Sequence, residues 1–425
     1  MNKKLNLAVA GALVAFASAA NAGISIPAGD WTVDISGNVN AFYINNHSTD
    51  KNTVNGGLAN KQSNNSSSSS INTGLLPSWL TIGAKSRQND LDVAWAISFQ
   101  PGASSGHSLA GGGGSEFRQA YLTFGDASWG TIKLGKDLGV FGQDAILSDM
   151  TLLGVGSQGI VGQAGGTTTT LGRIGAGYLY ADFNGQINYT SPNWNGFSFV
   201  AGIAQPLNTL NLDPYAASVA GQSGSSSQNF VASALASGSS GASAGAQQSP
   251  AFEAVARYAF TADQVTGKVW AEVKTQDVKG LPGGTSEQAT AYGIGANASA
   301  AGFGLTGYYY SAEGVGTTAW LMDGFAADGH KRKSDGGYVQ ATYTLPTSTK
   351  LGVSWGISKL ETADADDAAL ATNLVKENEM WTVGAYHPLT KSVNLVAEYS
   401  NVKATSQSNK ENQSDIISLG AILFF

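Results

Sequence analysis

Residues 91–99 read LDVAWAISF, and this segment decides the fold class. Its odd positions carry large apolar side chains, such as Trp95, whereas its even positions carry small or polar ones, such as Ser98. This alternation has the two-residue period of a β-strand with one apolar and one polar face. The same pattern recurs at 197–203, 351–357, 393–399 and 417–425. The sequence therefore predicts an all-β protein.

From this and similar segments we predict sixteen antiparallel strands. An even number is what a single-chain bacterial barrel requires. The predicted strands lie near 31–45, 78–88, 90–100, 116–125, 130–136, 174–190, 196–205, 251–261, 267–275, 288–299, 302–311, 336–345, 349–359, 379–387, 392–402 and 415–425.

The connections between these strands are short and long in strict alternation. Successive connections of an up-and-down barrel lie at opposite ends, and outer-membrane barrels have short periplasmic turns and long extracellular loops. The long segments lie near 46–77, 101–115, 137–173, 206–250, 276–287, 312–335, 360–378 and 403–414. A soluble β-sandwich has no reason to keep this alternation, so we predict a transmembrane β-barrel.

The composition agrees with a membrane barrel and excludes other classes. Only 12% of the residues are charged, against about 25% in a typical soluble protein. No stretch after the N-terminus reaches the roughly 18 apolar residues of a membrane helix. No basic patch interleaves with aromatic residues, so a nucleic-acid partner is not expected. Aromatic residues near predicted strand ends would form girdles at the membrane interfaces, and these are Trp31, Tyr43, Trp79, Trp129 and Trp381. The alternative is that they form the core of a soluble β-protein.

The first 22 residues have the parts of a secretory signal peptide. A basic start is followed by an apolar run from Leu5 to Ala20, and the segment ends Ala-Asn-Ala at Ala22. We therefore predict a signal peptide at 1–22 and one barrel domain at 23–425, with an uncleaved N-terminal anchor as the alternative. The chain contains no cysteine, so a disulfide scaffold is excluded.

Three motifs, in order, resemble the general Gram-negative porins. Residues 117–125 read FRQAYLTFG and residues 129–136 read WGTIKLGK, similar to the fourth and fifth strands of that family. Residues 189–199 read YTSPNWNGFSF, similar to its Tyr-x-Ser-Pro…Gly-Phe turn. The resemblance covers 31–425. It implies a homotrimer of sixteen-stranded barrels, each with a water-filled pore and a third loop folded into the lumen.

The resemblance also implies a pore constriction at the third loop, here from Gly135 to about Arg173. Many family members carry acidic residues at the tip of this loop, but residues 151–156 carry no charge. Asn38, and Ser78 or Trp79, stand where the family has a lysine and an arginine. A solvated position at a loop or rim is the alternative for each charge. The candidate constriction residues are Arg118, Lys133, Lys136, Asp137, Asp144, Asp149, Leu152, Leu153 and Arg173.

The chain ends in Phe425 after an alternating strand. A C-terminal phenylalanine in this position resembles the signal that the barrel-assembly machinery reads. The expected partners are therefore that machinery, outer-membrane lipid and lipopolysaccharide, and two further copies of the chain. Small polar solutes and ions are the expected cargo.

These features together predict an outer-membrane porin of a Gram-negative bacterium, for passive diffusion of ions and small hydrophilic solutes. The uncharged tip leaves open a substrate-specific channel with a weakly charged constriction. An adhesin or a closed structural barrel would use fewer residues. An enzyme needs a general base beside a nucleophile, and we predict neither an enzyme nor a cofactor or metal. The four histidines fall in predicted loops or at a turn: His47, His107, His330 and His387.

Overall fold

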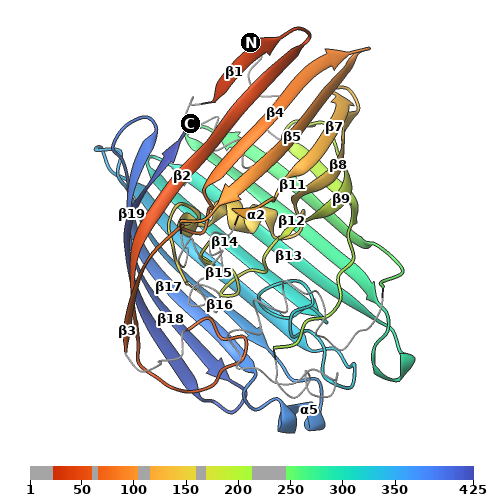
Figure 1. Ribbon diagram of the computed structural model, residues 1–425, viewed down its shortest axis with the longest axis vertical. Coiled ribbons are helices and arrows are strands. Elements are labelled where there is room, and N and C mark those ends of the chain that lie inside the picture. Colours follow the sequence, from red (N-terminus) through yellow and green to blue (C-terminus); the bar gives the residue numbers. More distant parts are fainter. Residues whose placement is uncertain (1–22, 60–65, 104–114, 159–168, 213–245) are drawn as a thin grey trace, which may run out of the picture.

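The computed structural model describes residues 23–59, 66–103, 115–158, 169–212 and 246–425. Within them, sixteen long strands form one closed antiparallel sheet (Figure 1), which confirms the predicted fold class. The predicted signal peptide at 1–22 lies outside the described residues. The sixteen strands are β2 (Trp31–Ser48), β4 (Trp79–Gln88), β5 (Leu91–Pro101), β7 (Ala120–Asp126), β8 (Gly130–Leu138), β9 (Phe183–Thr190), β10 (Phe197–Ala204), β11 (Ala251–Ala262), β12 (Val265–Val278), β13 (Glu287–Ala300), β14 (Phe303–Glu313), β15 (Lys333–Thr344), β16 (Lys350–Leu360), β17 (Val375–Pro388), β18 (Val393–Ser406) and β19 (Glu411–Phe424).

Three shorter strands extend this sheet. β1 (Ile24–Ala28) forms a hairpin with the start of β2, β3 (Ser67–Asn72) pairs with the end of β2, and β6 (Ser115–Glu116) pairs with the end of β5. None of the helices in the described part of the chain is long and apolar enough to cross a membrane.

The last strand closes the barrel against the first. β19 pairs with β2 over eleven residues from Ser48 to Asn38. Beyond this ladder, Gly37 and Phe425 exchange backbone hydrogen bonds of 2.8 and 3.0 Å. An open sheet edge in lipid would leave backbone groups unpaired, at several kcal/mol for each group. The closing position of the C-terminal strand follows from this requirement.

Side chains alternate between the outer face and the lumen, as the pattern at 91–99 predicted. Trp95 and Ile97 of β5 are 36% and 44% exposed on the outer face, whereas Ser98 and Gln100 are fully buried on the lumenal face. The prediction that Trp79 belongs to an interfacial girdle is wrong. Trp79 points into the lumen, is buried, and packs against the ring of Phe183 with centroids 5.7 Å apart.

The short connections are tight hairpins that match their sequences. Between β4 and β5, Asn89 and Asp90 both adopt positive φ angles, of 47° and 64°. This conformation gives a two-residue turn whose twist fits the flanking strands, and asparagine and aspartate tolerate it better than most residues. In Figure 1 the strand β1 and the C-terminus lie at one end of the barrel, and the helix α5 (Ala365–Leu370) lies at the other.

Two connections between strands differ in length from the prediction. The strand predicted at 174–190 begins only at Phe183, because Gly175 and Gly177 adopt φ angles of 80° and 136° that do not fit a strand. The third loop is therefore longer than predicted and runs from 139 to 182. The loop predicted at 403–414 is shorter, since β18 continues to Ser406 and β19 begins at Glu411.

Candidate functional site

The described parts of the segment between β8 and β9, residues 139–158 and 169–182, lie inside the barrel and are called the inner loop below. It contains two short helices, α2 (Gln143–Ser148) and η2 (Met150–Leu153). Figure 1 shows α2 within the ring of strands. Side-chain contacts of the loop fall on β11, β15, β17 and β18 and then on β2, so the loop follows the inner wall around much of the barrel.

A buried carboxylate of the wall holds the start of the inner loop. Glu253 of β11 accepts hydrogen bonds from the backbone N–H groups of Val140 and Phe141 at 2.6 and 3.2 Å. Its other oxygen lies 2.6 Å from Nζ of Lys274 on β12. Hydrogen bonds to an ionised acceptor are roughly twice as strong as neutral ones, so this contact fixes where the chain turns inward.

Helix α2 is held by two wall cations that share one carboxylate. Asp144 lies 2.6 Å from Nε of Arg257 and 2.5 Å from Nζ of Lys268. Burial alone would raise the pKa of Asp144, but these two cations hold its pKa below the usual value. The carboxylate therefore stays ionised at neutral pH.

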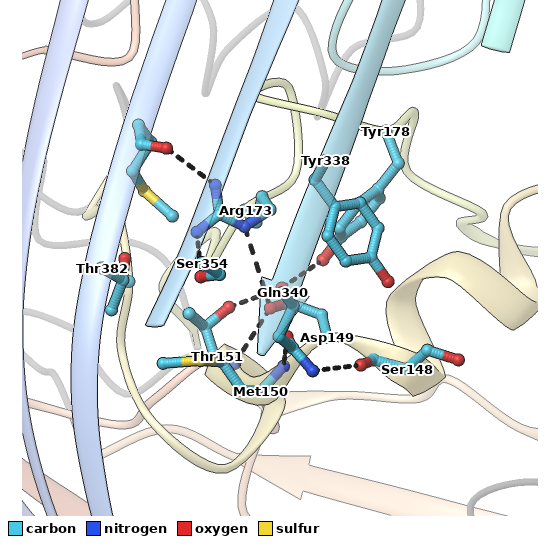
Figure 2. Close-up of polar contacts among 12 residues, drawn as sticks. Ser148, Asp149, Met150, Thr151, Arg173, Tyr178, Tyr338, Gln340, Ser354 and Thr382 are labelled. Atoms are coloured by element: carbon cyan, nitrogen blue, oxygen red, sulfur yellow. Dashed lines mark hydrogen bonds and ion pairs between the residues drawn. The ribbon is translucent and has the colours of Figure 1, made fainter. Parts of the chain in front are cut away.

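The middle of the inner loop is fixed by a buried network, drawn in Figure 2. Asp149 caps η2 by accepting from Thr151 N at 3.0 Å, and it also accepts from the hydroxyl of Tyr178 at 2.9 Å. Arg173, which has no exposed surface, lies 4.0 Å from Asp149. Its guanidinium donates to the carbonyl of Met380 on β17 at 2.9 Å. Arg173 thus ties the returning arm of the loop to the wall and to the outgoing arm.

The uncharged tip of the inner loop meets a carboxylate of the wall. Glu398 of β18 accepts from the backbone N–H groups of Val155 and Gly156 at 2.7 and 2.9 Å, and from the hydroxyl of Tyr386 at 2.6 Å. A Cβ atom at Gly154 would collide with this carboxylate, so any larger residue there would displace Glu398 from these contacts. The tip, which carries no charge of its own, is thus held by a carboxylate of the wall.

The two leucines near the tip pack into the protein interior. Leu152 is buried, and Leu153 is partly buried against the same hydrophobic cluster as Met150 and Val155. Their side chains anchor η2 to the wall by apolar contact. This placement weakens the hypothesis of an apolar constriction that selects less polar solutes.

A second group of charges lies on the wall at the foot of the inner loop. Lys133 and Asp137 share the lumenal face of β8, and Lys133 Nζ lies 2.5 Å from Asp137 Oδ2. Gln119 donates to the other carboxylate oxygen at 2.8 Å. Lys136 lies on the opposite face of β8, because strand side chains alternate, and it donates to the carbonyl of Phe117 at 2.8 Å.

Arg118 sits just before β7 and reaches the returning arm of the inner loop. Its Nε lies 2.7 Å from Glu116, and its guanidinium lies 5.4 Å from the ring centre of Phe183. It also donates to the hydroxyl of Tyr180 at 3.4 Å. Arg118 therefore lies near the loop, but its nearest carboxylate is in β6 and not in the loop.

The structure brings some candidate residues together and separates others. Lys133 pairs with Asp137, and Arg173 lies beside Asp149, whereas Asp144 pairs with wall cations that sequence analysis did not select. Five residues that contact the inner loop or its partners were not predicted from the sequence: Glu253, Arg257, Lys268, Lys274 and Glu398. All five are charged residues at lumenal positions of predicted strands. They could have been identified from the sequence, because each is a charged residue on the polar face of an alternating strand.

Loops at the α5 end of the barrel are joined by a buried ion pair. Arg332 forms two hydrogen bonds of 2.9 and 2.6 Å with the carboxylate of Asp367 in α5. Arg332 also donates to the carbonyl groups of Asp323 and Phe325 at 3.1 Å. Two parallel bonds from a guanidinium to a carboxylate give both strength and a fixed orientation.

Acid is expected to break the link between these loops. Burial alone would raise the pKa of Asp367, but hydrogen bonds and charge from Arg332 hold its pKa below the usual value of 3.8. The ion pair between Asp367 and Arg332 therefore stabilises the contact between the loops above about pH 4, and this stabilisation is lost as the pH falls through the lowered pKa of Asp367. We expect wild type to resist proteolysis at 361–374 better than Asp367→Asn at pH 7, and this difference to shrink as the pH falls below about 4 and through the lowered pKa. A difference that stays the same from pH 7 down to the acid unfolding of the loops would contradict the assignment.

The described histidines do not form a catalytic arrangement with a nucleophile. His47 and His387 share hydrogen bonds with Ser67 and Thr349, and His107 lies outside the described residues. His330 lies near Asp328 and Asp364, with possible ligand atoms within 4.8 Å of one another. All three side chains are exposed. Exposed acidic groups commonly gather without an ion, so we assign no metal to this cluster.

Comparison with known proteins adds independent information. The profile of a family described as Gram-negative porin matches residues 8–407. No curated protein matches the chain. The outer-membrane channel DcaP of Acinetobacter baumannii is similar in structure, with a TM-score of 0.67, 15% identity, and coverage of 95% of this chain and 100% of that one.

Two further solved structures share the fold. Pseudomonas putida OprB gives a TM-score of 0.57 at 10% identity, covering 92% of this chain and 94% of that one. A trimer form of OmpT, an outer-membrane protein of Vibrio cholerae, gives 0.50 at 14% identity, covering 93% and 99%. At these identities the likeness concerns the fold alone.

Proposed function

Since this chain belongs to the Gram-negative porin family and forms an outer-membrane channel for solute diffusion, we propose that its inner loop is the constriction that selects among solutes. The observation that carries the proposal is the fixation of this loop to the inner wall. Glu253 holds its start, Arg257 and Lys268 hold α2, and Glu398 holds its tip. A loop held at so many points narrows the lumen to a fixed size.

The candidate residues take different parts in this proposed constriction. Lys133 lines it, Asp137 and Asp144 lie buried behind the cations that they pair with, and Arg118 lines its edge beside Tyr180. Asp149, Leu152, Leu153 and Arg173 support the loop from within, because they are buried or partly buried. Lys136 lies on the other face of β8 and takes no part.

Liposome swelling tests the proposal directly. Proteoliposomes should swell in neutral sugars at rates that fall steadily with sugar size, because a fixed aqueous constriction sieves by size. Heat-denatured protein is the control. Uptake that saturates with one solute, or an ionic current that one solute blocks, would favour the alternative of a substrate-specific channel. No swelling in any sugar would contradict a general diffusion channel.

The assembly and export of the channel are further proposals. A homotrimer is supported by the trimer form of the related OmpT fold. The pairing of Phe425 with Gly37 supports a role of the last residue in assembly, with the barrel-assembly machinery as the partner. Outer-membrane lipid and lipopolysaccharide would cover the apolar outer face. A cleaved signal peptide at 1–22 accounts for export, and the channel works without catalysis, cofactor or metal.

A further inference from the structure

We propose that Lys133, Arg257 and Lys268 make this channel prefer anions, although the whole chain carries a formal net charge of −7. The inference rests on the proposed constriction at the inner loop. It concerns the sign of ion selectivity, which neither the composition nor the family indicates.

The first observation is an asymmetry of exposure within the ion pairs of the constriction. The side chain of Lys268 is 27% exposed and that of Arg257 12%, whereas their shared partner Asp144 is 5% exposed. The side chain of Lys133 is 15% exposed, against 6% for Asp137. In each of these contacts the cation meets the water and the carboxylate lies behind it, whereas at the edge of the constriction the order is reversed, with Arg118 12% and Glu116 43% exposed. Each of the contacts made by Asp144 and Asp137 is therefore a dipole with its positive end toward the permeating ion.

The second observation is an excess of positive charge in this group. Lys133 pairs one to one with Asp137, but Asp144 is shared by two cations. Three cations against two carboxylates leave one positive charge. Lys268 is the most exposed of the three, so the excess charge is presented to the lumen chiefly there.

The other lumenal acids on this wall do not reverse the sign. Glu253 is 2% exposed and pairs with Lys274, and Glu272 and Glu398 are 5% and 4% exposed. Glu398 is surrounded by two N–H groups and a hydroxyl that donate to it. These donors hold the carboxyl group against the wall, and little of it faces water.

Charges at the periplasmic rim act more weakly on a permeating ion than charges at the inner loop do. Arg87 pairs with both Asp92 and Asp126, and Lys85 pairs with Asp34, so these pairs leave one negative charge at the rim. Most of these groups are more exposed than those at the inner loop, and salt screens exposed charges beyond about 8 Å at physiological ionic strength. A narrow site with low-dielectric walls focuses the field of its own charges on a passing ion.

Reversal potentials in a KCl gradient test the inference on purified full-length protein in planar bilayers. Chloride is expected to be about threefold more permeant than potassium at low salt, with a smaller preference near 1 M because of screening. Lys268→Gln should bring the ratio close to one, and Lys268→Glu should make the channel prefer potassium. Lys403→Gln is the matched control, since Lys403 pairs with Glu411 on the outer face of β18 and should leave the ratio unchanged.

The wild-type current distinguishes loss of the channel from loss of its anion preference. Absence of current from the wild type would contradict the channel itself. Current with potassium as permeant as chloride, or more so, would overturn the anion preference while the channel stands. A Lys268→Glu variant that conducts with wild-type selectivity would also overturn it, because Lys268 would then lie away from the ion path.

Discussion

Replacing Glu398 by leucine is expected to change a steady channel into one whose current fluctuates. The carboxylate accepts three hydrogen bonds, from Val155 N, Gly156 N and the Tyr386 hydroxyl. Leucine would leave these donors buried without partners, at about 1–3 kcal/mol for each. The tip of the inner loop would then leave the wall and move within the lumen. Single-channel recordings should show excess open-channel noise and brief closures.

Two variants control this experiment. Glu398→Gln keeps the size and one good acceptor, so its noise should lie between that of wild type and Glu398→Leu. Glu411→Leu removes an exposed carboxylate on the outer face and should conduct like wild type. A quiet Glu398→Leu channel with wild-type conductance would show that Glu398 does not hold the tip.

Among the single substitutions considered for the inner loop, replacing Arg173 by methionine is expected to cause the largest loss of stability. Arg173 is fully buried, donates to Met380 O and to the Ser354 hydroxyl, and lies 4.0 Å from Asp149. Methionine keeps much of the apolar volume but leaves Asp149 buried without a nearby cation. Removing one partner of a buried pair costs about 3–5 kcal/mol. The midpoint of thermal unfolding in detergent should fall accordingly.

A double variant separates the charge effect from the packing effect. Asp149→Asn removes the isolated charge, so Arg173→Met with Asp149→Asn should be more stable than Arg173→Met alone. Arg87→Met at the exposed rim should change the midpoint little. Equal midpoints for wild type and Arg173→Met would show that Arg173 is not a structural anchor.

The barrel was predictable because its signals are local. The alternation at 91–99 places each side chain on one face within a strand, and Asn89-Asp90 specifies a tight turn from two residues. Where the local signal was ambiguous the prediction was wrong. The strand expected at 174–190 begins at Phe183, because Gly175 and Gly177 take conformations that a hydrophobic pattern does not reveal.

The constriction was less predictable because its partners are distant in the chain. Asp144 was selected from the sequence, but Arg257 and Lys268, which bind it, lie 113 and 124 residues further on. Their pairing depends on how far the inner loop reaches around the wall and on the register of β11 and β12. Trp79 shows the same limit. A tryptophan near a strand end fits a membrane interface, yet here its position in β4 faces the lumen.

The most direct test of the whole account is the single-channel conductance of the purified wild-type protein in a planar bilayer. A water-filled barrel narrowed by a fixed inner loop should give discrete, ohmic steps that scale with salt concentration and occur in threes if the channel is a trimer. A protein that inserts as a folded barrel but gives no conductance steps would contradict the account.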